Sequence, residues 1–172
     1  MAFTPKETAL DRDLEAVQAL IMKMGGLVEA AIVDSARALD ERDEELALRV
    51  RRNDAEIDRL EHEVNEECAR VISMRGPLAK DLRTVLTVMK ISANLERCGD
   101  YAKNLAKRTS VLVQMQPVGG ASKSIRRMSR EVDRMLKDAL DAYIQRDAEL
   151  AEDVRNRDQD IDQMYNALFR EL

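Results

Sequence analysis

The 172-residue sequence is poor in the residues on which nucleic-acid-binding and disulfide-bonded proteins depend. Aromatic residues make up 3% of the chain, tryptophan is absent, and the formal net charge is -5. Phosphate backbones need a basic surface and unpaired bases need aromatic platforms, so we expect no nucleic acid as a partner. Two cysteines cannot form a framework of disulfides or paired metal ligands, which favours reduced thiols and a cytoplasmic location.

Signals for export, membrane insertion and nucleophilic catalysis are also lacking. The amino-terminal stretch MAFTPKETALDRDLEA is too polar for a signal peptide, and no apolar run approaches the roughly 20 residues of a membrane span. His62 is the only histidine and lies in an acidic helical segment, where a surface position is expected. Pairing of His62 with Cys68 or Cys98 is possible on paper, but no motif supports it.

Helix-forming residues, in contrast, are abundant. Hydrophobic residues make up 45% of the chain and recur at spacings of three and four, which predicts an all-α fold. We expect a first helix over about Lys6–Asp40, a second from Asp43 to the breaker Arg75-Gly76-Pro77, and a third over 78–112. Two apolar stripes on the third helix predict that it is the most enclosed of the three. Gly25-Gly26 inside the first helix suggests a close helix contact.

The chain then repeats itself. With a shift of 104 residues, RDEELALRVRRNDAEID (42–58) lies over RDAELAEDVRNRDQDID (146–162), which indicates a duplicated three-helix unit. We therefore predict tandem three-helix bundles: a first bundle over 1–116, a linker over 117–121, and a second, incomplete repeat over 122–172.

The third helix of the second repeat would begin beyond the last residue of the chain. We expect a truncated chain or an unrepresented tail, the alternative being a genuine five-helix protein. An apolar face without its covering helix favours association, so a homodimer or a domain-swapped assembly is expected.

Two pairs of carboxylates lie where apolar residues are expected. Glu96 and Asp100 are four residues apart and continue an apolar stripe of the third helix. Asp54 and Asp58, also four apart, border the apolar seam of the second helix. Like charges one turn apart repel each other, and ionised carboxylates near a core cost several kcal/mol unless something pairs them.

Two kinds of compensation are open from the residues alone. Basic side chains nearby in sequence could pair with the carboxylates, namely Arg51, Arg97 or Lys103. Alternatively, a hard cation such as Mg, Ca, Mn or ferric iron could lie between the helices, since all-oxygen ligation suits such ions. A simply solvated acidic face is the third interpretation. It is weakened because the pattern recurs in the repeat as Asp158 and Asp162.

The segment RGPLAKDLRTVLTVMKISANLERCGDYAKNLA (75–106), the paired aspartates and the duplication together resemble the PhoU family of phosphate-uptake regulators. The resemblance covers nearly the whole chain and implies tandem three-helix bundles whose acidic motifs line metal sites. Carried over position by position, it assigns six metal ligands: Asp54, Asp58, Glu96, Asp100, Asp158 and Asp162. The second site would be incomplete, because the partner motif of its sixth helix is absent from this sequence.

The resemblance also implies a function. PhoU-like proteins are negative regulators of phosphate-starvation signalling, cytoplasmic adaptors between the phosphate ABC transporter with its ATPase and a sensor histidine kinase. It implies no catalytic activity, no direct membrane insertion, and a bound Mg, Mn, Fe or Zn ion. Two alternatives stay open: a purely structural helical scaffold, and a carboxylate-bridged metalloenzyme. The lone histidine argues against the redox form of the latter, because di-iron sites built on Glu-x-x-His pairs need two.

Overall fold

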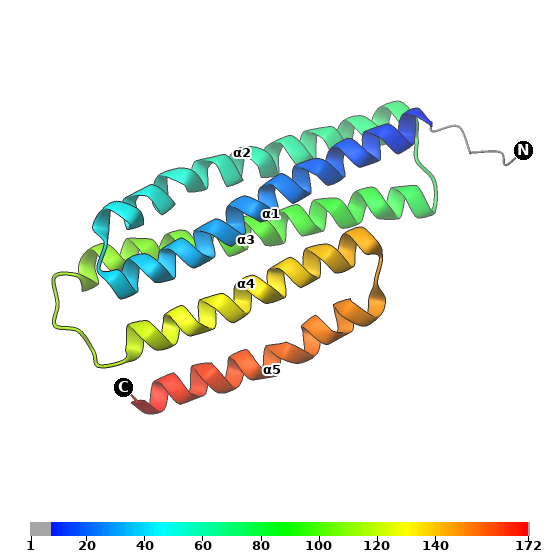
Figure 1. The fold of residues 1–172 in the computed structure, drawn as a ribbon. Helices are drawn as coiled ribbons and strands as arrows, with labels where there is room; N and C mark the ends of the chain where they lie inside the picture. The colour runs from blue at the N-terminus through cyan, green and yellow to red at the C-terminus, as the bar shows by residue number, and fades with distance from the viewer. Residues whose placement is uncertain (1–7, 172) are drawn as a thin grey trace, which may run out of the picture.

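The computed structural model describes residues 8–171, and every regular element in this range is an α-helix. Figure 1 shows the helices lying side by side, joined by short connections. Their bounds are α1 (Ala9–Glu41), α2 (Glu44–Arg75), α3 (Lys80–Leu112), α4 (Ala121–Gln145) and α5 (Ala148–Glu171). The all-α prediction is confirmed. The expected start of the first helix near Lys6 lies outside the described residues.

Local signals fix the helix ends close to where the sequence places them. Thr8 and Asp11 form a capping box, in which the Thr8 hydroxyl accepts from the Asp11 N–H at 3.1 Å. The Asp43 carboxylate accepts from the Leu46 N–H at 2.9 Å and caps α2. Gly76 ends α2 in the left-handed region, with φ of 54°, where glycine carries no Cβ penalty.

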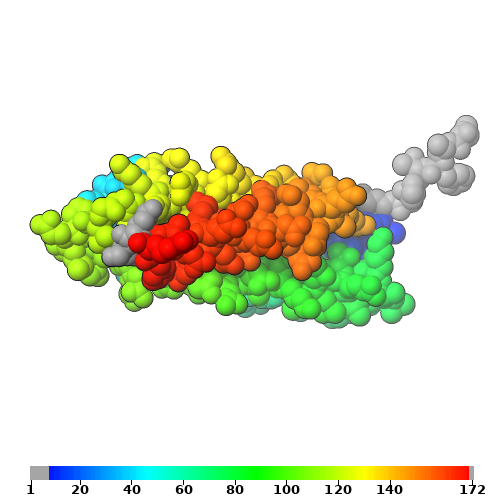
Figure 2. Space-filling view, turned by 90° about the horizontal axis from the view of Figure 1, so that it is seen from below, coloured from blue at the N-terminus to red at the C-terminus, as the bar shows by residue number. Residues whose placement is uncertain are grey.

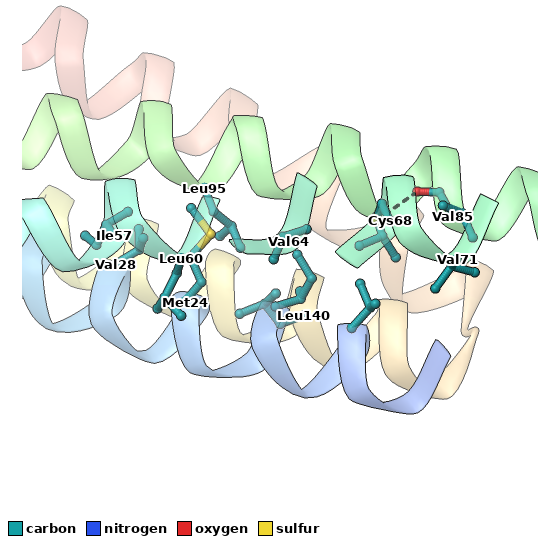
Figure 3. Packing of buried hydrophobic residues seen from close by; sticks show 13 residues of the cluster. Met24, Val28, Ile57, Leu60, Val64, Cys68, Val71, Val85, Leu95 and Leu140 are labelled. Carbon is teal, nitrogen blue, oxygen red and sulfur yellow. Dashed lines mark hydrogen bonds between the residues drawn. The ribbon is translucent and has the colours of Figure 1, made fainter. Parts of the chain in front are cut away.

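The first three helices form a bundle around one apolar core. Figure 3 shows Ile57, Leu60 and Val64 of α2 packed among side chains of the neighbouring helices, Met24 of α1 and Leu95 of α3 among them. All five are at most 4% exposed. Removal of this apolar surface from water is the main stabilising term of the bundle.

The second repeat docks on the first through α1. A Cβ built on Gly25 of α1 would lie 2.5 Å from Leu140 Cδ1 of α4, so the predicted close contact at the glycine pair exists. As a result α1 contacts α2, α3 and α4, whereas α3 contacts α1 and α2. The prediction that the third helix is the most enclosed is therefore wrong. One of its apolar stripes is partly turned to solvent, with Leu86 47% exposed.

By length and composition, α1 contains a stretch apolar enough to cross a membrane, contrary to the expectation that no apolar run approaches such a span. In the bundle this helix contributes Val17, Ile21, Met24 and Val28 to the core. A core helix of this kind passes the same test as a membrane span, so the finding is weak evidence for one.

The helix α5 lies at the outer edge of the molecule, and α4 is its single neighbour among the described helices. Figure 2 shows α5 running along one face of the molecule. Leu168 is buried, but Tyr165 and Phe169 are 51% and 60% exposed. Within the described range the second repeat thus has two helices, as the sequence predicts.

Candidate functional site

Four of the six predicted site residues lie on neighbouring stretches of α2 and α3, with Asp54 buried, Glu96 and Asp100 half-buried, and Asp58 exposed. Asp54 and Asp58 lie one turn apart on α2, and Glu96 and Asp100 lie one turn apart on α3. The two helices pack against each other along the bundle. The charges of Asp54 and Asp100 act on Asp58, and those of Asp100 and Asp58 act on Glu96, so the four carboxylates form one electrostatic group.

Asp54 is the most deeply placed of these residues. It is 3% exposed, and its Oδ1 is buried without a hydrogen-bond partner. The carboxylate lies against the bare backbone of Gly99, because a Cβ there would be 3.6 Å from Asp54 Oδ1. The same Cβ would lie 3.0 Å from Ile57 Cδ1. Glycine at position 99 therefore lets α3 approach α2 closely at the level of this carboxylate.

A basic side chain also enters the group. The Lys103 ammonium contacts Asp54 Oδ2 and lies 3.5 Å from Asp100 Oδ1, so that it links one carboxylate of each helix. Of the three basic candidates from the sequence, Lys103 makes this contact. Arg97 instead donates to the Tyr101 hydroxyl at 3.0 Å, and Arg51 is exposed.

The carboxylates of the α2–α3 group outnumber its one ammonium, and this excess of negative charge affects their pKa values. Burial raises the pKa of Asp58, and the neighbouring carboxylates raise it further, against a lowering by Lys103. Burial likewise raises the pKa of Glu96, followed by the charge of Asp100. The hydrogen bond with Asp54 raises the pKa of Lys103, which keeps the ammonium protonated.

Glu61 is a member of this group that the sequence analysis missed. Its charge raises the pKa of both Asp58 and Glu96. A signal for it exists in the sequence, since Glu61 follows Asp54 by seven residues and therefore lies on the same face of α2.

The residues fit a hard cation by their chemistry. The donors are all carboxylate oxygens, and Asp54 Oδ1 is a buried acceptor without a partner. Over residues 8–171, however, no group of three or more Asp, Glu, His or Cys side chains is already arranged to hold a metal ion. The position that links the two helices is taken by the Lys103 ammonium.

Asp158 and Asp162, the remaining predicted ligands, are exposed on α5. Since α5 packs on α4 alone in the described part of the chain, the structure brings no second carboxylate helix against this pair. The metal-ligand role of Asp158 and Asp162 stays a prediction.

The thiol and imidazole groups differ in burial. Cys68 and Cys98 are free thiols, and Cys68 Sγ is buried, 4.0 Å from the Val85 carbonyl oxygen. Burial raises the pKa of the Cys68 thiol to about 11. The His62 imidazole is exposed, as expected, and lies 3.3 Å from Glu66 Oε1. A Cys–His nucleophile therefore receives no support from these positions.

Comparison with known proteins places this arrangement in a family. The PhoU domain matches residues 21–109 and, a second time, residues 125–172. The chain belongs to the PhoU family. Both matches fall on the two halves of the duplication, and the first contains all four carboxylates of the α2–α3 group.

Relatives within the PhoU family resemble the chain over most of its length. The "Phosphate-specific transport system accessory protein PhoU homolog" of Caulobacter vibrioides is 41% identical over 93% of this chain and 70% of its own length. The homologue of that name from Zymomonas mobilis is 44% identical over 95% and 69%. The crystal structure of PhoU from Pseudomonas aeruginosa superposes with a TM-score of 0.89, at 35% identity, over 94% of this chain and 77% of the other.

Proposed function

We propose that this protein is an accessory protein of phosphate transport and a negative regulator of phosphate-starvation signalling. In this role it is a cytoplasmic adaptor between the phosphate ABC transporter, through its ATPase, and a sensor histidine kinase, without catalytic activity of its own. The observation that carries the proposal is the identity of 41% to 44% with proteins named as phosphate-transport accessory proteins. Long helices with wide exposed faces are compatible with a role that depends on partners.

Genetic complementation tests the regulatory role. The chain is expressed in Pseudomonas aeruginosa from which the native PhoU has been deleted, with a reporter for phosphate-starvation genes. We expect the reporter to be repressed in high phosphate and released in low phosphate. Continued expression at high phosphate, with the protein present and folded, would refute the regulatory role. Co-purification with the transporter ATPase and with the sensor kinase tests each proposed partner separately.

We further propose that the α2–α3 carboxylates bind a hard metal ion such as Mg, Mn, Fe or Zn. The support is the all-oxygen donor set and the buried, unpartnered Asp54 Oδ1. The test is metal content by mass spectrometry of the purified protein, beside a variant with Asp54, Asp58, Glu96 and Asp100 changed to Asn or Gln. We expect stoichiometric metal in the native protein and its loss in the variant.

A second candidate has one observation in its favour. Because Lys103 already pairs with Asp54 and Asp100, the carboxylates could be held by basic side chains in a purely structural scaffold. Absence of metal from both proteins, even after soaking in Mg, Mn, Zn and iron salts, would favour this scaffold. The regulatory role would then depend on the helical surfaces alone.

A further inference from the structure

The place between α2 and α3 that suits a cation holds an ammonium of the chain itself. Lys103 joins Asp54 of α2 to Asp100 of α3, as a bridging metal ion would. Its side chain is 38% exposed, so Lys103 lies near the surface although its ammonium contacts the buried Asp54. A lysine side chain of this kind has several rotatable bonds and can swing its ammonium into solvent.

The burial of Asp54 requires a positive charge close to its carboxylate. An ionised carboxylate with 4% of its side chain exposed is costly unless a counter-charge accompanies it. Lys103 provides this charge through Oδ2, while Oδ1 stays without a hydrogen-bond partner. Lys103 thus supplies the positive charge between α2 and α3 at this level.

One ammonium does not balance the surrounding carboxylates. Asp58, Glu96 and Glu61 act on one another, but none of them has an ion pair with a basic side chain in the described residues. A divalent or trivalent ion carries more charge than lysine and accepts more oxygen ligands at once. Such an ion would pair with more of these carboxylates than the Lys103 ammonium does.

We infer that Lys103 is a resident counter-cation, and that metal binding at this site is an exchange in which the ion displaces the Lys103 ammonium into solvent. The inference rests on the proposed metal site and adds that the Lys103 ammonium competes with the metal ion for the carboxylates. The site accepts a metal ion only in the fraction of molecules in which the Lys103 ammonium has moved out. The apparent affinity for the ion is therefore the intrinsic affinity multiplied by that fraction. The same factor weakens every ion that binds here, so only ions that bind the carboxylates tightly occupy the site.

The test compares manganese(II) binding by calorimetry to the chelator-treated native protein, Lys103→Met and Lys107→Met. Lys107 is the matched control, since it lies one turn further along α3, is exposed, and does not belong to the carboxylate group. We expect Lys103→Met to bind manganese at least about tenfold more tightly than the native protein, and Lys107→Met to bind as the native protein does. Metal should also raise the melting temperature of Lys103→Met more than that of the native protein.

The outcomes separate the inference from the proposed site. Equal manganese affinity in Lys103→Met and the native protein, or weaker affinity in the variant, overturns the competitor role while the metal site stands. No manganese binding in any of the three overturns the site and the inference together.

A second measurement needs no variant and therefore does not depend on the folding of Lys103→Met. The amines of the native protein are acetylated briefly with and without manganese, and modification of Lys103 and Lys107 is read by mass spectrometry. We expect manganese to increase modification of Lys103 severalfold and to leave Lys107 unchanged. Unchanged modification of Lys103 in manganese-bound protein contradicts its displacement.

Discussion

At the scale of single residues, ionisation within the carboxylate group lowers the stability of the fold. The exposed Asp58 and the half-buried Glu96 have raised pKa values, first because nearby protein displaces water from their carboxyl groups, and then because like charges lie beside them. A carboxyl group whose pKa is higher in the folded than in the unfolded state destabilises the fold once it ionises. The destabilisation therefore grows as pH rises from the ordinary value of 3.8 through the raised pKa of Asp58.

Asp58→Asn should therefore stabilise the metal-free protein at neutral pH. We expect a gain of about 0.2–0.5 kcal/mol from relief of the repulsion with Asp54 one turn away, and no gain below pH 3.8. Urea unfolding in the presence of chelator at several pH values measures it. The matched control is Asp160→Asn, at an exposed aspartate of α5, which should change little. A loss of stability at neutral pH in Asp58→Asn would contradict the repulsion.

The two thiols should differ in reactivity. Burial raises the pKa of Cys68 from 9.0 to about 11, so about a hundredfold less thiolate is present at pH 8. The half-buried Cys98 should react with a chromogenic disulfide faster than Cys68, which we expect to react only after unfolding. Labelling of Cys68→Ser and Cys98→Ser assigns the two rates. Fast labelling of Cys68 in the folded protein would show that the core opens readily.

At the scale of helices, bare glycine backbone sets how closely neighbours approach. Gly99 serves the α2–α3 contact at Asp54, and Gly25 serves the α1–α4 contact at Leu140. Gly26 has open space around its Cβ position, so it performs no such role in the described structure. A methyl group added at Gly25 would thus meet Leu140, whereas one added at the adjacent Gly26 would meet open space.

The pair Gly25 and Gly26 makes a direct comparison possible. Gly26→Ala should stabilise the protein by about 0.5–1 kcal/mol, because alanine loses less backbone entropy in a helix interior. Gly25→Ala should gain nothing or lose stability, since its Cβ would be 2.5 Å from Leu140 Cδ1. Denaturant unfolding of both variants measures the difference. Equal gains would mean that α4 does not pack closely on α1.

At the scale of the whole molecule, the two repeats are unequally supported. The first forms a bundle with a continuous core, whereas α5 has α4 as its one neighbour among the described helices. The rings of Tyr165 and Phe169 of α5 contact each other at a centroid distance of 4.8 Å, tilted by 56°, and both residues are largely exposed. Exposed aromatic pairs of this kind favour association.

We predict that the chain forms a homodimer through the face of α5. Sedimentation equilibrium at rising concentration should show the dimer, and Tyr165→Ser with Phe169→Ser should weaken it by at least about tenfold. The control is Tyr101→Ser, at an exposed tyrosine of α3, which should leave the dissociation constant of the dimer unchanged. A native chain that stays monomeric at high concentration contradicts the prediction.

Local rules account for the parts that the sequence predicted well. The ends of α2 follow from the Asp43 cap and from Gly76, which act within a few residues. The pairing of acidic residues on one face follows from helical periodicity alone. The sequence does not predict which basic side chain pairs with Asp54. Arg51, Arg97 and Lys103 are all candidates, and the packing of the helices determines that Lys103 makes the contact.

The sequence by itself determined the helices, the duplication and the placing of paired carboxylates on one face of α2 and of α3, since periodicity and repeats depend on residue order and not on neighbours in space. Tertiary structure alone decided that α1, and not α3, is the most surrounded helix, because this depends on α4 docking at Gly25. It also decided that Asp54 is buried against Gly99 and paired with Lys103. Contacts and charge pairs between helices depend on how the helices pack, which the spacing of residues along one helix does not specify.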